Sequence, residues 1–257
     1  MNKPNRLTRF FFYGDSNTYG FDPRGFLGGR YPADVRWADI LQKTFRGTCD
    51  FTFEGMNGRS IPVSRTEYRW LEQMIRRAFP LDYAAVMLGT NDLLMTARPD
   101  AAAAAGRMHT LVEWLLDLPV LKESGARVIL MIPPYAAVHV RKEDPYYRYY
   151  AESVRLAELY RKVPAGHGGR VLCIDTTAWD IELAYDDVHF TEKGSLSFAK
   201  EMEGRSGRCF HPMSACDLDA FPHGILISTD AALFFYGTIG TPCQILSLPE
   251  PLRSMGT

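Results

Sequence analysis

Short apolar runs alternate with amphipathic stretches along most of this chain. The apolar runs cover residues 10–13, 49–53, 83–88, 127–132 and 170–175, and each has the length of a buried strand. Residues 33–45, 70–79 and 101–121 carry apolar positions at helical spacing, as does the helix after the aromatic loop that begins at Tyr135. This alternation predicts an α/β fold, a doubly wound (flavodoxin-like) three-layer sandwich with a five-stranded parallel sheet. The order of the strands does not follow from the pattern.

Two of the helices have specific expected features. Asp34 stands near the start of the first helix, where it is expected to act as a cap. In the second helix, Trp70, Met74 and Ile75 are expected to face inward, and Pro80 ends the helix.

The periodic pattern stops after a last amphipathic helix that fades near Met202. We therefore expect one domain over residues 1–202 and a C-terminal extension of unknown role, poorly ordered, over residues 203–257. This extension brings Cys209, His211, Cys216 and His223 close together in sequence. Their spacing matches no usual zinc motif, so no metal is expected there.

Composition excludes several classes of function. Lys and Arg number 29 against 30 Asp and Glu, and a net charge of −1 gives no field that would attract nucleic acid or anionic lipid. No apolar segment is long enough for a signal peptide or a membrane span, which predicts a cytoplasmic protein. The five cysteines are odd in number and indicate no disulfide framework. The Gly-Lys-Ser/Thr of a phosphate cradle is missing, and no cofactor is expected.

Polar residues follow the predicted strands, at the positions where α/β folds usually carry their active-site residues. Ser16 follows the first strand, Gly58 the second and Asn91 the third, and Asp186 and His189 lie beyond the fifth. The carboxyl ends of parallel strands share one edge of a sheet, so these residues are expected to meet there. A serine, an imidazole, a carboxylate and oxyanion donors are what hydrolytic acyl transfer needs.

Taken singly, each of these residues also has a plain structural role. Ser16 or Asp15 could simply cap a helix, and Gly58 and Asn91 could simply form turns, without any role in catalysis. Among the six histidines, His189 is distinguished by an acidic residue three positions earlier in a loop after the last strand.

The motifs together resemble the SGNH (GDSL-type) hydrolase family, nearest its arylesterase/acyltransferase branch. The blocks that carry the resemblance, in order, are Gly14-Asp15-Ser16-Asn17, Gly58, Gly89-Thr90-Asn91-Asp92 and Asp186-x-x-His189. The resemblance implies that Ser16 is the nucleophile, His189 the general base and Asp186 its orienting partner. It also implies an oxyanion hole formed by the backbone N–H groups of Ser16 and Gly58 and the side-chain amide of Asn91. Position 17 departs from the commonest signature, which has Leu where this chain has Asn17.

The expected function is therefore a serine esterase that cleaves short-chain acyl or aryl esters through an acyl-enzyme, with acyl transfer to alcohols as a further activity. A carbohydrate O-deacetylase and a non-enzymatic binding module on the same fold are the alternatives. The expected partner is a small-molecule ester. Four tyrosines at 146, 147, 149 and 150 also predict a homo-oligomer, although a buried helix face accounts for them equally well.

Overall fold

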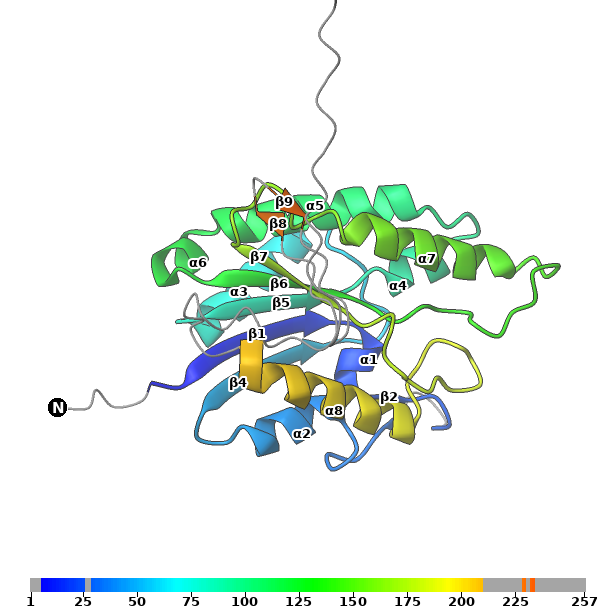
Figure 1. Ribbon diagram of the computed structural model, residues 1–257, viewed down its shortest axis with the longest axis horizontal. Coiled ribbons are helices and arrows are strands. Elements are labelled where there is room, and N and C mark those ends of the chain that lie inside the picture. The colour runs from blue at the N-terminus through cyan, green and yellow to red at the C-terminus, as the bar shows by residue number, and fades with distance from the viewer. Residues whose placement is uncertain (1–5, 26–28, 210–227, 230–231, 234–257) are drawn as a thin grey trace, which may run out of the picture.

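A five-stranded parallel sheet lies between two layers of helices in the computed structural model (Figure 1), which describes residues 6–25, 29–209, 228–229 and 232–233. The strands, in their spatial order, are β4 (Cys49–Gly55), β1 (Thr8–Gly14), β5 (Tyr83–Met87), β6 (Arg127–Ile132) and β7 (Val171–Asp175). All four neighbouring pairs are parallel. The predicted fold class is confirmed, and the structure adds the strand order, in which β1 lies between β4 and β5.

Helices cover both faces of this sheet (Figure 1). One face is covered by α2 (Trp37–Thr44) and α8 (Glu192–Cys209), and the other by α3 (Arg65–Ala78), α5 (Ala101–Asp117), α6 (Pro119–Ser124) and α7 (Tyr147–Tyr160). Two short helices, α1 (Ser16–Tyr19) and α4 (Thr90–Leu94), directly follow β1 and β5. Two antiparallel pairs complete the described elements: β2 (Phe21–Asp22) with β3 (Gly29–Arg30), and β8 (Ser228–Thr229) with β9 (Ala232–Leu233).

The interior strand β1 is apolar on both sides because both of its faces are covered. Phe10 and Phe12 pack in one core with Trp37 of α2 and Phe198 of α8. Phe11 and Tyr13 point to the other face and pack in the core beneath α3 and α5. An unbroken aromatic run therefore serves two cores at once, and it holds the end of β1 firmly where Ser16 follows.

Four predicted helix boundaries are wrong, among them the start of α3, which begins at Arg65 rather than at Trp70. The first helix begins at Trp37 rather than Ala33, because Pro32 O accepts the N–H groups of Val35 and Arg36 in a turn, and Asp34 does not cap it. The stretch 101–121 forms two helices because Leu118, which precedes a proline, is extended. Helix α8 continues to Cys209 instead of ending near Met202, since no proline interrupts that stretch.

The inward face of α3 agrees with the expectation at Ile75 and at Met74, which packs against the core, but not at Trp70. Leu71 and Ile75 are fully buried, whereas the side chain of Trp70 is 58% exposed. The helix begins at Arg65, after a capping box between Ser64 and Glu67. Its buried face carries Leu71 and Ile75, which lie one helical turn apart. Trp70 lies off that face.

The tyrosine cluster is divided between core and surface. Tyr149 is buried and donates its hydroxyl to Thr96 O at 3.0 Å, whereas Tyr146 is 63% exposed. Among the described residues, no helix is long and apolar enough to cross a membrane. The extension beyond Cys209 lies outside the described residues except for the β8–β9 pair, and so do His211, Cys216 and His223.

Candidate active site

Ser16 stands beyond the carboxyl end of the interior strand β1, where the chain turns into the short helix α1. Asp15 caps this helix by accepting the N–H of Asn17 at 3.0 Å, so the turn has a fixed shape. Ser16 is the first residue of the helix and is 5% exposed. Its hydroxyl is thus held by a rigid turn at the edge of the sheet where doubly wound folds carry their ligand sites.

The imidazole of His189 bridges the serine hydroxyl and a carboxylate. Its Nε2 lies 2.9 Å from Ser16 Oγ, and its Nδ1 lies 2.7 Å from Asp186 Oδ2. A carboxylate can only accept, so Nδ1 carries the proton, and Nε2 is left as the acceptor for the serine O–H. The predicted serine, histidine and acid are therefore brought together in one hydrogen-bonded line, in which a neutral ring can accept the serine proton at Nε2.

Asp186 is itself held in place by its own loop. Its Oδ1 accepts the N–H groups of Val188 at 3.1 Å and His189 at 3.0 Å. Partial burial raises the pKa of Asp186, but these N–H groups and the His189 ring outweigh burial and hold the pKa below its ordinary value. Asp186 is consequently ionised at neutral pH and oriented toward the ring.

Asn17 connects the serine turn to the histidine loop. Its side-chain amide donates to Val188 O at 3.0 Å, and its side-chain oxygen accepts the N–H of Phe190 at 3.1 Å. The two bonds therefore reach the residues directly before and directly after His189. Asn17 is itself held by Trp37, whose Nε1 donates to the backbone oxygen of Asn17 at 2.8 Å. The asparagine that departs from the commonest signature thus binds the histidine loop to the turn that carries Ser16.

A tight turn after β4 presents the other predicted oxyanion donor. The N–H of Arg59 donates to Met56 O at 3.2 Å, and Gly58 has a φ of +72°, a combination that defines a type II turn and favours glycine at that position. The same turn is joined to β1, because Met56 N–H donates to Gly14 O at 3.2 Å. Gly58 therefore stands next to the strand end that precedes Ser16.

Asn91 and Arg59 fix this turn from inside the protein. Asn91 Nδ2 donates to Arg59 O at 3.0 Å, so its amide lies against the Gly58 turn. The Arg59 guanidinium is buried over the ring of Tyr13, 4.1 Å from its centroid, and donates to Gly14 O at 2.9 Å and to Glu54 O. Arg59 thereby binds the carboxyl ends of β1 and β4 together.

Asp92, the neighbour of Asn91, has a supporting role. Its carboxylate is 3% exposed, accepts the N–H of Ile61 at 3.0 Å and pairs with Arg107 of α5 at 2.9 Å. The loop that follows Gly58 is thereby fastened to α4 and α5.

Asp187 faces away from the imidazole. Its carboxylate contacts the N–H and the ring Nδ1 of His139, and its backbone oxygen accepts the N–H of Ala137 at 2.9 Å. Asp187 therefore holds the segment after β6, and of the two adjacent acids it is Asp186 that contacts His189.

Four large aromatic or sulfur-containing side chains lie on segments close to the candidate residues. The Phe21 ring packs on His189 with centroids 4.5 Å apart, and Tyr185, which is 81% exposed, donates its hydroxyl to Pro23 O. On the other side, the Met95 methyl group lies 3.4 Å from the position that a Cβ at residue 58 would take. Met95 is 70% exposed and Met56 is 51% exposed. We call these four side chains, Phe21, Met56, Met95 and Tyr185, the apolar rim.

A serine, an imidazole and a carboxylate in one hydrogen-bonded line at the carboxyl edge of a parallel sheet is the arrangement of serine hydrolases. The profile of the GDSL-like Lipase/Acylhydrolase family matches residues 12–195, and the chain belongs to this family. It is accordingly a carboxylic ester hydrolase.

Solved structures of similar fold agree with this family. A putative arylesterase from Agrobacterium tumefaciens is 26% identical, with a TM-score of 0.62 over 78% of this chain and 99% of that one. A carbohydrate acetylesterase family member from Sinorhizobium meliloti is 25% identical, with a TM-score of 0.62 over 77% and 97%. The aryl esterase of M. smegmatis is 23% identical, with a TM-score of 0.62 over 77% and 99%, and shares the fold. A comparison with curated proteins finds no match.

The supporting roles of Asn17 and Arg59 do not follow from the sequence. A buried asparagine between two loops 171 residues apart has no local pattern, because its partners are backbone groups. Arg59 offers one signal, a basic residue directly after a turn glycine and close to an apolar strand.

We predict that Asn17→Leu lowers catalytic efficiency on an aryl acetate about 10- to 100-fold, mainly through kcat. The substitution removes both side-chain bonds that position the histidine loop but leaves the apolar rim intact, so KM should change little. Steady-state kinetics measure this split, and thermal unfolding reports any accompanying loss of stability. Unchanged kcat in a folded Asn17→Leu protein would contradict the positioning role.

Asp15 generates a prediction about pH. Complete burial raises the pKa of Asp15 to about 6, against the opposing effects of the Asn17 N–H and the charges of His189 and Arg59. The unfolded chain ionises this carboxyl near pH 4, so the folded state holds the proton more tightly and loses stability as the pH rises through about 6.

Asp15→Asn keeps an oxygen for the Asn17 N–H but cannot ionise. The variant should gain stability over the wild type progressively between pH 4 and 6, reaching on the order of 2–3 kcal/mol above pH 7. Urea unfolding across this pH range measures the difference. A difference independent of pH would show that Asp15 is not the titrating group.

Proposed function

We propose that this chain is a serine esterase that hydrolyses short-chain acyl or aryl esters through an acyl-enzyme, with Ser16, His189 and Asp186 as the catalytic residues. The observation that carries the proposal is the continuous hydrogen-bonded line from Ser16 Oγ through both ring nitrogens of His189 to Asp186.

In the first step, Ser16 Oγ attacks the ester carbonyl carbon while its proton passes to His189 Nε2. Asp186 stabilises the imidazolium that forms, because its ionised carboxylate accepts the Nδ1–H. The carbonyl oxygen becomes an oxyanion, for which the backbone N–H groups of Ser16 and Gly58 and the Asn91 amide are the proposed donors. The tetrahedral intermediate then collapses, and the alcohol leaves with the proton from His189.

In the second step, water enters and His189 takes one of its protons. The hydroxide attacks the acyl carbon, and the collapse of the second intermediate returns the proton to Ser16 and releases the acid. An alcohol in place of water would receive the acyl group, which is the proposed transfer activity.

The apolar rim supports aryl and short acyl esters as substrates. Met56 begins the Gly58 turn and Met95 lies against it, whereas Phe21 packs on His189 and the exposed Tyr185 binds Pro23 O. Phenyl groups and short alkyl chains that bind such a surface remove apolar area from contact with water, which is favourable. A sugar needs polar partners for its hydroxyl groups instead. The similarity to an arylesterase agrees with this choice.

A carbohydrate O-deacetylase is the second candidate, supported by the similarity to a carbohydrate acetylesterase family member. A panel that compares phenyl acetate and p-nitrophenyl butyrate with acetylated xylose and acetylated glucosamine separates the two. Our proposal expects higher kcat/KM on the aryl esters. Higher kcat/KM on the acetylated sugars would favour the deacetylase.

We predict that Ser16→Ala lowers the rate of p-nitrophenyl acetate hydrolysis on the order of 10⁴-fold, because no nucleophile remains. Ser64→Ala, which alters a capping serine on α3, is the matched control and should keep its kcat. Wild-type turnover by Ser16→Ala would overturn the assignment. A wild-type protein that bound the ester without cleaving it would instead favour a binding module.

A further inference from the structure

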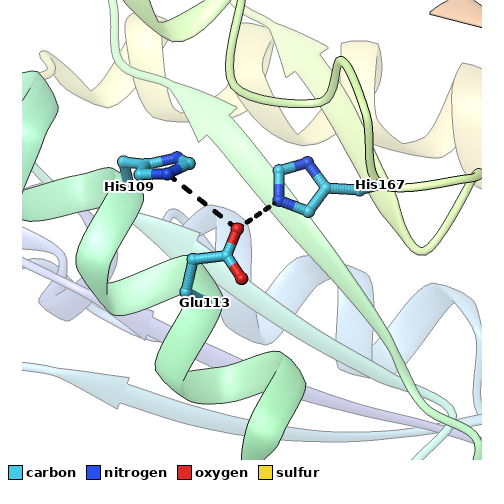
Figure 2. Close-up of side chains that lie close together, drawn as sticks. All are labelled: His109, Glu113 and His167. Carbon is cyan, nitrogen blue, oxygen red and sulfur yellow. Dashed lines mark hydrogen bonds and ion pairs between the residues drawn. The ribbon is translucent and has the colours of Figure 1, made fainter.

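Two histidines and a glutamate meet on the helical layer away from the active site (Figure 2). His109 and Glu113 lie one turn apart on α5, and His167 comes from the loop between α7 and β7. One nitrogen or oxygen atom of each lies within 4.8 Å of those of the other two. The loop leads into the amino end of β7, whereas Ser16 follows the carboxyl end of β1, so the cluster and the active site belong to opposite edges of the sheet.

The glutamate oxygen lies between the two imidazole rings. Glu113 Oε1 is 2.7 Å from His167 Nε2 and 3.9 Å from His109 Nε2, and the ring centroids are 6.1 Å apart. A tetrahedral zinc site with ligands about 2.1 Å from the ion places its donor atoms about 3.4 Å apart. Only small side-chain rotations separate the observed arrangement from this geometry.

The parts that would have to rotate are free to do so. The side chains of His109 and Glu113 are 57% and 49% exposed, whereas that of His167 is 10% exposed and forms the fixed point of the cluster. The loop turns on either side of it at Gly166 and Gly168, whose φ angles are +84° and +54°. Arg170, which ends the loop, donates to Leu116 O of α5 at 2.8 Å and thereby holds the loop against the helix.

A ligand at Nε2 of His167 requires a change of tautomer. In the ion-free arrangement Nε2 carries a proton and donates it to Glu113 Oε1 at 2.7 Å, whereas Nδ1 is buried and has no hydrogen-bond partner within the described part of the chain. A metal at Nε2 requires the proton on Nδ1. Because no described acceptor then supports that proton, the affinity should be moderate compared with sites whose histidines are supported by a carboxylate or carbonyl.

We propose that His109, Glu113 and His167 form a binding site for a divalent transition metal of the zinc class, with water as the remaining ligand. Two imidazoles and one carboxylate suit Zn²⁺, whereas Mg²⁺ and Ca²⁺ prefer sites made of oxygen atoms. The ion would connect α5 to the α7–β7 loop. Its role is to stabilise the fold rather than to act on the ester, because it lies at the opposite edge from Ser16.

The test is a calorimetric titration of the full chain with zinc chloride, together with thermal unfolding with and without Zn²⁺. Glu113→Gln preserves size but removes the anionic ligand, and His109→Gln is a second variant at an exposed position. Glu158→Gln, an exposed glutamate on α7, is the matched control. The five cysteines are common to every variant, so any zinc bound by thiolates cancels in the comparison.

We expect the wild type and Glu158→Gln each to bind one Zn²⁺. Glu113→Gln and His109→Gln should bind Zn²⁺ more weakly, on the order of tenfold or more. Zn²⁺ should raise the Tm of the first pair only, because an ion that binds only the folded state stabilises it. Ester hydrolysis should be equal in all four proteins and unaffected by a chelator, which also shows that the variants fold. Equal Zn²⁺ binding by all four proteins, or none by the wild type, would overturn the proposal and leave an ion-paired surface cluster.

Discussion

The hydrogen bond between Ser16 and His189 joins residues 173 positions apart, and the other contacts of the candidate active site hold the two loops that carry these residues. A hydroxyl can pass its proton to an imidazole only at hydrogen-bond distance, so a displacement of either loop by about 1 Å would cost much of the rate. Each loop is anchored separately. The serine turn is held by β1 and the Asp15 cap, and the histidine loop by the carboxylate of Asp186, which accepts two backbone N–H groups.

Buried polar side chains connect these separately anchored loops. Asn17 binds the histidine loop through both ends of its amide, Arg59 binds the ends of β1 and β4, and Asp92 fastens the Gly58 loop to α5. Such groups are costly to bury unless they are satisfied. In these positions most of their polar atoms bind backbone groups or a paired arginine, whereas Arg59 Nε is buried without a hydrogen-bond partner in the described part of the chain.

The sequence predicted the sheet and its catalytic edge better than it predicted the helices. Strands such as 83–87 are apolar throughout because both faces are covered, and their short length and regular alternation with helices distinguish them from buried helices. The position predicted for Trp70 is wrong because an amphipathic helix with several large apolar residues permits more than one buried face, and only packing against the sheet selects Leu71 and Ile75. Pro119 indicates that the helix over residues 101–121 is interrupted at Leu118. The apolar positions continue beyond this proline, which is why a single helix was predicted.

The assembly of the site was predicted by a topological rule, since carboxyl ends of parallel strands share one edge. The supporting contacts were not, because Asn17 and Arg59 act on backbone atoms whose positions depend on the whole fold. The cluster of His109, Glu113 and His167 was equally invisible, since 54 residues separate Glu113 from His167 and their approach depends on how the α7–β7 loop crosses α5.

The most direct test of the account compares Asp186→Asn with Asp187→Asn, two adjacent carboxylates of which Asp186 contacts His189 and Asp187 contacts His139. Asp186→Asn removes the charge that stabilises the imidazolium and the acceptor that fixes its tautomer, so kcat on p-nitrophenyl acetate should fall on the order of 10³- to 10⁴-fold. Asp187→Asn only weakens the contact with His139 and should stay within a few-fold of the wild type. A severe loss in Asp187→Asn with a mild one in Asp186→Asn would contradict the assignment of the acid.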